Sequence, residues 1–187
     1  MIKIILDTDM GPDCDDAGAL AIANRLHNNG IIELVGVTHC TSDIGGAYTI
    51  AAINSFFSNR DISVGQTAAK CFLDGDENKK FSEKIKDNFI TEYGECRFDD
   101  AVTLLRSILA DNDGIKLVCI GQLNNLASLL KSSPDNISKL NGIELVKKKI
   151  SEIIIMAGDF RGREYPPEYN IKCDVESARY VADNCPV

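Results

Sequence analysis

Short apolar runs alternate along the chain with longer segments in which apolar residues recur every three or four positions. The apolar, β-branched runs predict buried strands at residues 2–6, 31–38, 62–64, 115–120 and 151–156. The segments with helical spacing predict helices at residues 17–27, 47–57, 98–110, 124–131, 135–149 and 174–183. Strands separated by helices predict an α/β fold, with a mostly parallel open sheet and helices on both of its faces.

Two parts of the chain do not follow this alternation. Residues 65–97 are polar and irregular, with Asp74-Gly75-Asp76 as a turn signal, and an irregular segment of that length is typical of a functional lid or a mobile loop. The chain stops at Val187, directly after the last predicted helix, where an α/β chain normally continues into another strand. We therefore expect residues 1–187 to form a single α/β domain that is the N-terminal part of a larger fold.

Composition narrows the class of protein. The chain has 187 residues, of which 44% are hydrophobic and 26% charged, as in ordinary folded domains. Its formal net charge of −8 disfavours nucleic acid as a partner, because the phosphate backbone attracts basic surfaces. The seven cysteines include no C-x-x-C pair, and no apolar run approaches the roughly 20 residues that span a bilayer. These features predict reduced thiols, a cytoplasmic location and no membrane association.

The loop after the first predicted strand concentrates acidic residues. Leu6 is followed by Asp7-Thr8-Asp9-Met10-Gly11-Pro12-Asp13-Cys14-Asp15-Asp16, which places five carboxylates within ten residues at the carboxyl end of a buried strand. Their mutual repulsion and desolvation would cost several kcal/mol without a counter-charge. Carboxylate oxygens suit Ca²⁺ or Mg²⁺ better than zinc. The alternative is a solvated acidic turn in which Asp15 or Asp16 caps the next helix.

This loop resembles the N-terminal signature of the inosine-uridine nucleoside hydrolase family, D-x-D-P-G-x-D-D-A-x-A-L. The chain has Met10 at the position of the proline and two additional residues before the Asp pair. Three later segments also resemble family motifs: residues 121–127 resemble G-P-L-T-N-L-A, residues 153–158 resemble I-x-x-M-G-G, and residues 168–178 resemble E-F-N-x-x-x-D-P-E-A-A. These ordered matches extend over nearly the whole chain, and they imply a Rossmann-like nucleoside hydrolase core that is incomplete.

The resemblance implies calcium-dependent hydrolysis of the N-glycosidic bond of ribonucleosides, which gives free base and ribose. It implies that Asp9 is the general base and a calcium ligand, and that Asp16 is the principal calcium ligand. Asn124 would offer its backbone carbonyl to calcium, although the family usually has threonine there. In such a reaction the metal orients a water molecule and lowers its pKa, and the carboxylate accepts the proton.

The resemblance also implies a set of ribose contacts. Asp15 would bond a ribose hydroxyl, Glu168 and Asn170 would grip the ribose, and Met156 would line the sugar face. Asp43 lies near the position of an asparagine with which the family contacts the ribose. Less specific explanations exist for several of these residues, since Met156 suits a core, Glu168 suits a surface and Asn124 suits a helix start.

Other polar residues have no assigned role. Asp7 is expected to orient the loop, and Asp13 has no family counterpart and is expected to be a surface acid. The family also has a calcium-binding aspartate, often beside an active-site histidine, in its C-terminal part, to which nothing here corresponds. His27 is expected on a helix surface, whereas His39 follows the second strand and approaches the site on one interpretation.

Two alternative functions remain open at this point. A truncated or degenerate family member could fold and bind Ca²⁺ or ribosides without turnover. A haloacid-dehalogenase-like phosphatase also has D-x-D after its first strand and uses Mg²⁺, but Met10-Gly11-Pro12 and the Asp15-Asp16 pair fit its pattern poorly. The family is commonly oligomeric, so a homo-oligomer is possible.

Overall fold

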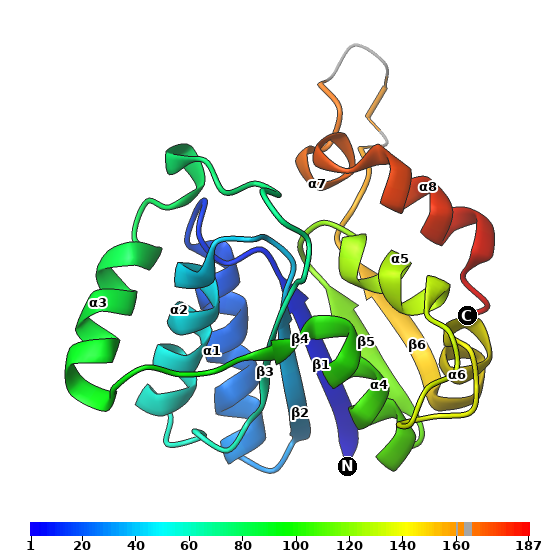
Figure 1. Ribbon diagram of the computed structural model, residues 1–187, viewed down its shortest axis with the longest axis horizontal. Coiled ribbons are helices and arrows are strands. Elements are labelled where there is room, and N and C mark those ends of the chain that lie inside the picture. Colours follow the sequence, from blue (N-terminus) through cyan, green and yellow to red (C-terminus); the bar gives the residue numbers. More distant parts are fainter. Residues whose placement is uncertain (160, 163–165) are drawn as a thin grey trace.

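The computed structural model contains one six-stranded sheet and describes residues 1–159, 161–162 and 166–187. The strand order is β4-β3-β2-β1-β5-β6, and every neighbouring pair is parallel (Figure 1). The strands are β1 (Ile2–Thr8), β2 (Ile32–His39), β3 (Val64–Gln66), β4 (Asp99–Asp100), β5 (Ile115–Cys119) and β6 (Ile150–Ile155). The predicted α/β fold with a mostly parallel sheet is therefore confirmed.

Helices connect the strands on both sides of the sheet. They are α1 (Asp15–Asn28), α2 (Ile44–Phe56), α3 (Ser82–Tyr93), α4 (Ala101–Asp111), α5 (Asn124–Lys131), α6 (Gly142–Lys149), α7 (Tyr169–Cys173) and α8 (Val175–Asn184), with a short 3₁₀ helix, η1, at Asp76–Asn78. Figure 1 shows α1, α2 and α3 on one side of the strands and α4, α5 and α6 on the other. None of the helices in the described residues is long and apolar enough to cross a membrane.

The two faces of the sheet bury separate apolar clusters. Neighbouring residues of a strand point to opposite faces, so Ile5 and Leu6 of β1 belong to different clusters. Ile5 packs with Leu105 of α4 and Leu126 of α5, whereas Leu6 packs with Leu20 of α1. All five side chains are at most 4% exposed, so β1 is covered on both faces in the middle of the sheet.

Residues 65–97 are more ordered than the sequence pattern predicted. They contain η1 and the 12-residue helix α3, which packs on α2. In α3 only Ser82 and Phe89 are buried, so too few apolar positions recur at helical spacing for the sequence to predict this helix. The prediction of a continuous irregular loop was wrong.

The predicted helix at 135–149 is shorter in the structure. It begins at Gly142, after a capping box in which Asn141 and Glu144 bond each other's backbone N–H groups. Asp135 instead binds the buried guanidinium of Arg106, at 2.7 and 3.0 Å. That ion pair, together with hydrogen bonds from backbone N–H groups to Asp135, fixes residues 132–141 in a non-helical path.

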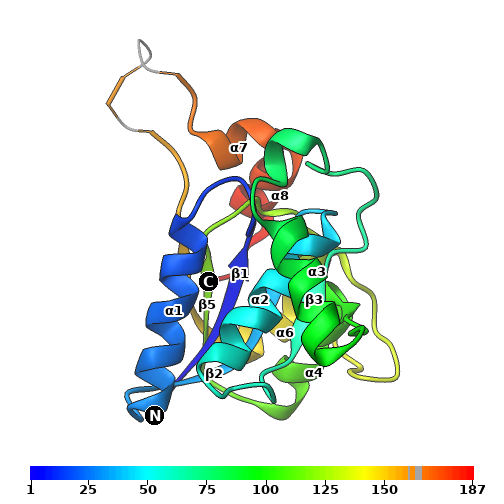
Figure 2. The same ribbon diagram turned by 90° about the vertical axis from the view of Figure 1, so that its left-hand side faces the viewer.

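The carboxyl ends of the strands meet at one edge of the sheet, which is the edge where ligands bind in open α/β folds. Backbone hydrogen bonds join the first residues of the loops there: Cys40 N to Thr8 O at 2.9 Å, Ile120 N to Asp7 O at 2.8 Å, and Met156 N to Cys119 O at 2.9 Å. Because the loops begin in register, the residues that follow each strand are held side by side. Figure 2 shows α7 and α8 at the same end of the molecule as the loop after β1.

Candidate functional site

A cavity of about 130 Å³ lies at this edge of the sheet. Its walls come from the loop after β1, the residue after β5, the residue after β6 and the start of α7. Six of the eight residues predicted for the site line it: Asp9, Asp15, Asp16, Met156, Glu168 and Asn170. They come from positions up to about 160 residues apart, and the order of the strands brings them together.

Asp9 lines this cavity and is 5% exposed. Its Oδ2 accepts a 2.8 Å hydrogen bond from Nε2 of Gln122. Burial raises the pKa of Asp9, while the hydrogen bonds with Gln122 and Asp16 oppose that rise. The Asp9 carboxylate is therefore held by the Gln122 amide and also contacts the acidic side chain of Asp16.

Asp16 is the second buried carboxylate, with 4% of its surface exposed. The hydroxyl of Thr8 donates a hydrogen bond to its Oδ1. Burial, followed by the charge of Asp9, raises the pKa of Asp16 to about 8. These like charges crowd one another, and no lysine or arginine of the described residues lines the cavity.

Three acids of this loop, Asp13, Asp15 and Asp16, form a group. One carboxylate oxygen from each lies within 4.8 Å of those of the other two. The hydrogen bond between Asp13 and Asp15 raises the pKa of Asp13 to about 6 and lowers that of Asp15. Grouped hard oxygen donors and crowded negative charge fit a divalent cation such as Ca²⁺. The cluster shares only Asp16 with the predicted ligand set of Asp9, Asp16 and Asn124.

The opposite wall is formed around α7. Glu168 caps this helix by accepting hydrogen bonds from the backbone N–H groups of Asn170 at 2.8 Å and Ile171 at 3.0 Å. Asn170 is buried, and its Nδ2 donates to Ile120 O at 3.1 Å. Met156 is 47% exposed, so it forms part of the cavity wall and is not a core residue.

Two of the predicted residues do not line the cavity. Asp43 caps α2, and its carboxylate accepts from Gly45 N at 3.0 Å and from Ser82 Oγ at 2.6 Å. Asn124 begins α5, and its Nδ2 donates to Cys40 O at 2.9 Å while its Oδ1 is buried without a hydrogen-bond partner. Both side chains are therefore turned into the protein in this structure.

Asp7 and His39 form a layer behind the cavity. Asp7 is 1% exposed and accepts from Thr38 Oγ1 at 2.6 Å and Asn125 Nδ2 at 2.9 Å. Burial raises the pKa of Asp7 to about 7. His39 is fully buried between Gln66 and the carbonyl of Met10, and burial lowers its pKa. Neither side chain lines the cavity.

Gln122 and Tyr169 are two residues of the site that were not predicted from the sequence. Gln122 stands at the proline position of the G-P-L-T-N-L-A motif. This departure from the motif is the feature of the sequence that could have identified Gln122 as a site residue. Tyr169 lines the cavity, and burial raises its pKa to about 12. It occupies the phenylalanine position of E-F-N, so it adds a hydroxyl to that wall.

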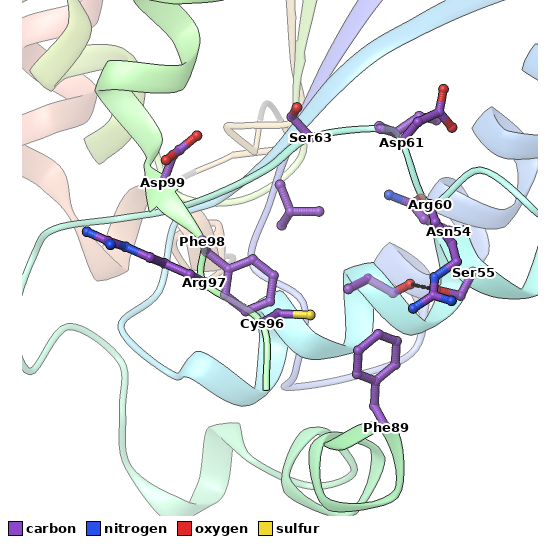
Figure 3. Close-up of a pocket in the computed structure, with 13 residues that line it drawn as sticks. Asn54, Ser55, Arg60, Asp61, Ser63, Phe89, Cys96, Arg97, Phe98 and Asp99 are labelled. Atoms are coloured by element: carbon purple, nitrogen blue, oxygen red, sulfur yellow. Dashed lines mark hydrogen bonds between the residues drawn. The ribbon is translucent and has the colours of Figure 1, made fainter. Parts of the chain in front are cut away.

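A second cavity, of about 270 Å³, lies by the amino end of β3 and therefore away from the acidic loop. Figure 3 shows the ring of Phe98 beside it, with Arg97 extending away from its centre. Asn54 also lines it, and its buried Nδ2 has no hydrogen-bond partner. None of the predicted site residues belongs to this cavity.

Comparisons of sequence and of structure find known proteins that this chain resembles. A sequence model described as inosine-uridine preferring nucleoside hydrolase matches residues 4–187. No curated protein matches the chain. The inosine-uridine preferring nucleoside hydrolase from Bacillus anthracis has a similar fold, with a TM-score of 0.72 and 20% identity over 98% of this chain and 62% of its own.

Two further structures extend the likeness. The purine-preferring ribonucleoside hydrolase from Gardnerella vaginalis aligns with a TM-score of 0.66 and 25% identity, over 96% of this chain and 57% of its own. The type III effector protein XopQ, complexed with adenosine diphosphate ribose, aligns with a TM-score of 0.69 and 20% identity, over 98% of this chain and 52% of its own. The chain thus spans between 52% and 62% of the lengths of these three structures. On the match of residues 4–187, the chain belongs to the inosine-uridine preferring nucleoside hydrolase family.

Proposed function

We propose that the protein takes part in calcium-dependent hydrolysis of the N-glycosidic bond of ribonucleosides, giving free base and ribose. The observation that carries this proposal is the edge cavity, which places the acidic loop opposite Glu168 and Asn170. Acids on one wall and sugar-binding polar groups on the other suit a substrate whose ribose lies between them.

Asp9 is the general base in this proposal. Gln122 occupies its Oδ2, so the other oxygen can accept a proton from a water molecule in the cavity. Asp9 and Asn170 line the same cavity, which supports a role for Asp9 next to a ribose held by Asn170. Asn170 has a second Nδ2 hydrogen available for a sugar oxygen, because the bond to Ile120 O uses only one.

Asp9, Asp13, Asp15 and Asp16 would hold the calcium ion, and Asp15 would also reach a ribose hydroxyl. The chemistry that calcium would supply there is a lower pKa for a water molecule and a positive charge for hydroxyl oxygens. Asp13 is an addition to the predicted ligand set, proposed because its oxygen lies within the same 4.8 Å group. Asn124 stays a candidate through its backbone carbonyl, and Asp43 a candidate ribose contact that would need its cap on α2 to open.

The test is ribose release from inosine and from uridine, in Ca²⁺ and in a calcium chelator. We expect release in Ca²⁺ only and its loss in Asp9→Asn, with Asp111→Asn as the control because Asp111 is an exposed acid on α4. Release by Asp9→Asn at the wild-type rate would contradict the assignment of the base.

A second candidate is a ribonucleoside-binding protein without turnover. The XopQ structure, in complex with adenosine diphosphate ribose, supports binding of a ribosyl group by this fold. Binding of inosine by calorimetry without any ribose release would select this candidate.

We further propose a cytoplasmic location and self-association. Seven free cysteines suit a reducing compartment. Exposed Ile154 and Ile155 of β6 suit contact with another copy. Sedimentation of the purified protein over a range of concentrations tests the second point, and a monomer at all concentrations would refute it.

A further inference from the structure

Gln122 is a buried amide that links the two walls of the edge cavity. It lies between β5 and α5 and is 0% exposed. Its Nε2 donates to Asp9 Oδ2 at 2.8 Å and to Asn170 Oδ1 at 2.9 Å, and its Oε1 accepts from Cys40 Sγ at 3.5 Å. A primary amide has two N–H donors, and here each serves one wall.

These contacts fix the orientation of the Gln122 amide. A flip would turn its carbonyl oxygen toward the carboxylate of Asp9 and remove both donated bonds. The neighbouring Gly121 allows the close approach, because a Cβ there would lie 2.6 Å from Cys40 Sγ and 2.8 Å from Asp9 N. The family motif has proline at the position of Gln122. Proline carries no side-chain donor and cannot link the two walls.

The link also determines how Asn170 presents its side chain. Because Asn170 Oδ1 faces Gln122 and one Nδ2 hydrogen is bonded to Ile120 O, the remaining hydrogen has a fixed direction. Asp9, Gln122 and Asn170 therefore form one hydrogen-bonded unit, joined across 113 and 48 residues of sequence.

We propose that Gln122 is a positioning residue that couples the orientation of Asp9 to that of Asn170, so that the base and the sugar-binding amide act together. The proposal rests on the proposed function of this cavity. It predicts that replacing the amide by an apolar side chain of similar length disturbs both walls at once, and that the Gln122 and Asn170 substitutions are not additive.

The test compares Gln122→Met, Asn170→Ala and the double variant, in Ca²⁺. Asn24→Leu is the matched control, because Asn24 is also 0% exposed, donates two hydrogen bonds and accepts one. It lies on α1, bonds Asn54 of α2 and does not line the edge cavity. We expect Asn24→Leu and Gln122→Met to lower the thermal midpoint alike. Only Gln122→Met should weaken inosine binding, by about tenfold, the loss of a hydrogen bond to a charged group.

Asn170→Ala in the Gln122→Met background should weaken binding by less than about twofold more, since the unit is already broken. With turnover, kcat should fall through Asp9 and KM should rise through Asn170. Unchanged inosine affinity in Gln122→Met, or losses that multiply in the double variant, would overturn the proposal.

If the wild-type chain binds no inosine, the proposed function fails, but the coupling can still be tested. The side-chain amide signal of Asn170, identified by its loss in Asn170→Ala, should shift in Gln122→Met and stay in place in Asn24→Leu. An Asn170 signal unmoved by Gln122→Met would refute the coupling itself.

Discussion

Asn125 donates a 2.9 Å hydrogen bond to Asp7, a carboxylate that lies behind the cavity and has a buried Oδ2 without a partner. The raised pKa of Asp7, about 7 against 3.8 in its ordinary state, follows chiefly from this burial. Between these values the folded protein holds a proton on Asp7 that the unfolded chain has lost. Stability from this group is therefore complete below about pH 4 and falls as the pH rises through 7.

The Asp7→Asn variant should remove that dependence. In a calcium chelator, we expect the free energy of unfolding of the wild type to fall more steeply between pH 4 and 7 than that of Asp7→Asn, by up to about 4 kcal/mol in total. Urea unfolding at several pH values measures the difference. Parallel profiles for the two proteins would show that the pKa of Asp7 is the same in the folded and the unfolded protein.

Calcium should stabilise the protein through Asp16. We expect Ca²⁺ to raise the thermal midpoint, by the equivalent of about 2.7 kcal/mol at a hundred times the dissociation constant. Asp16→Asn should abolish most of this rise, because it removes one of two buried carboxylates of the cavity. Asp111→Asn should retain it, and a rise that persists in Asp16→Asn would place the ion elsewhere.

Arg106 should be among the most sensitive positions of the fold. Its guanidinium is almost fully buried and bonds Asp135, Ser132 and the carbonyls of Ser138 and Leu140. Arg106→Leu should lower the free energy of unfolding by about 2–3 kcal/mol, because it removes the hydrogen bonds of a buried guanidinium, while Asp135 keeps partial access to water. Arg25→Leu, at an exposed position on α1, should change it by less than about 0.5 kcal/mol, measured by the same urea titration.

The glycines Gly121 and Gly18 should respond in opposite directions to alanine. A Cβ at Gly121 would meet Cys40 and the backbone of Asp9, so Gly121→Ala should destabilise the protein by about 1–3 kcal/mol. A Cβ at Gly18, inside α1, meets nothing within 4 Å, so Gly18→Ala should stabilise by about 0.5–1 kcal/mol. Thermal midpoints of the two variants check both signs, and equal shifts would show that space around the backbone is not the cause.

The sequence pattern predicted the elements that bury a clear apolar face. Helix α5 begins and ends where its spacing predicted, at Asn124 and Lys131, because six of its eight residues are buried. Helix α3 was missed because it buries only two residues. Local spacing therefore predicts an element well only when that element contributes much to the core.

The candidate site shows the same limit at longer range. The acids of the loop after β1 are adjacent in sequence and could be found there, whereas Gln122 becomes a site residue only through partners 113 and 48 positions away. The Asp43 carboxylate lies close to Gly45 and caps α2, a local preference that a motif comparison does not weigh.

Strand β6 has one more consequence. Among the described strands its paired neighbour is β5, and Ile154 and Ile155 expose 47% and 36% of their surfaces. Backbone N–H and C=O groups along such an edge can template the addition of any extended segment that meets them. A lysine in place of Ile154 would put a charge on this exposed apolar strand edge, and so would reduce aggregation of the protein through added strands.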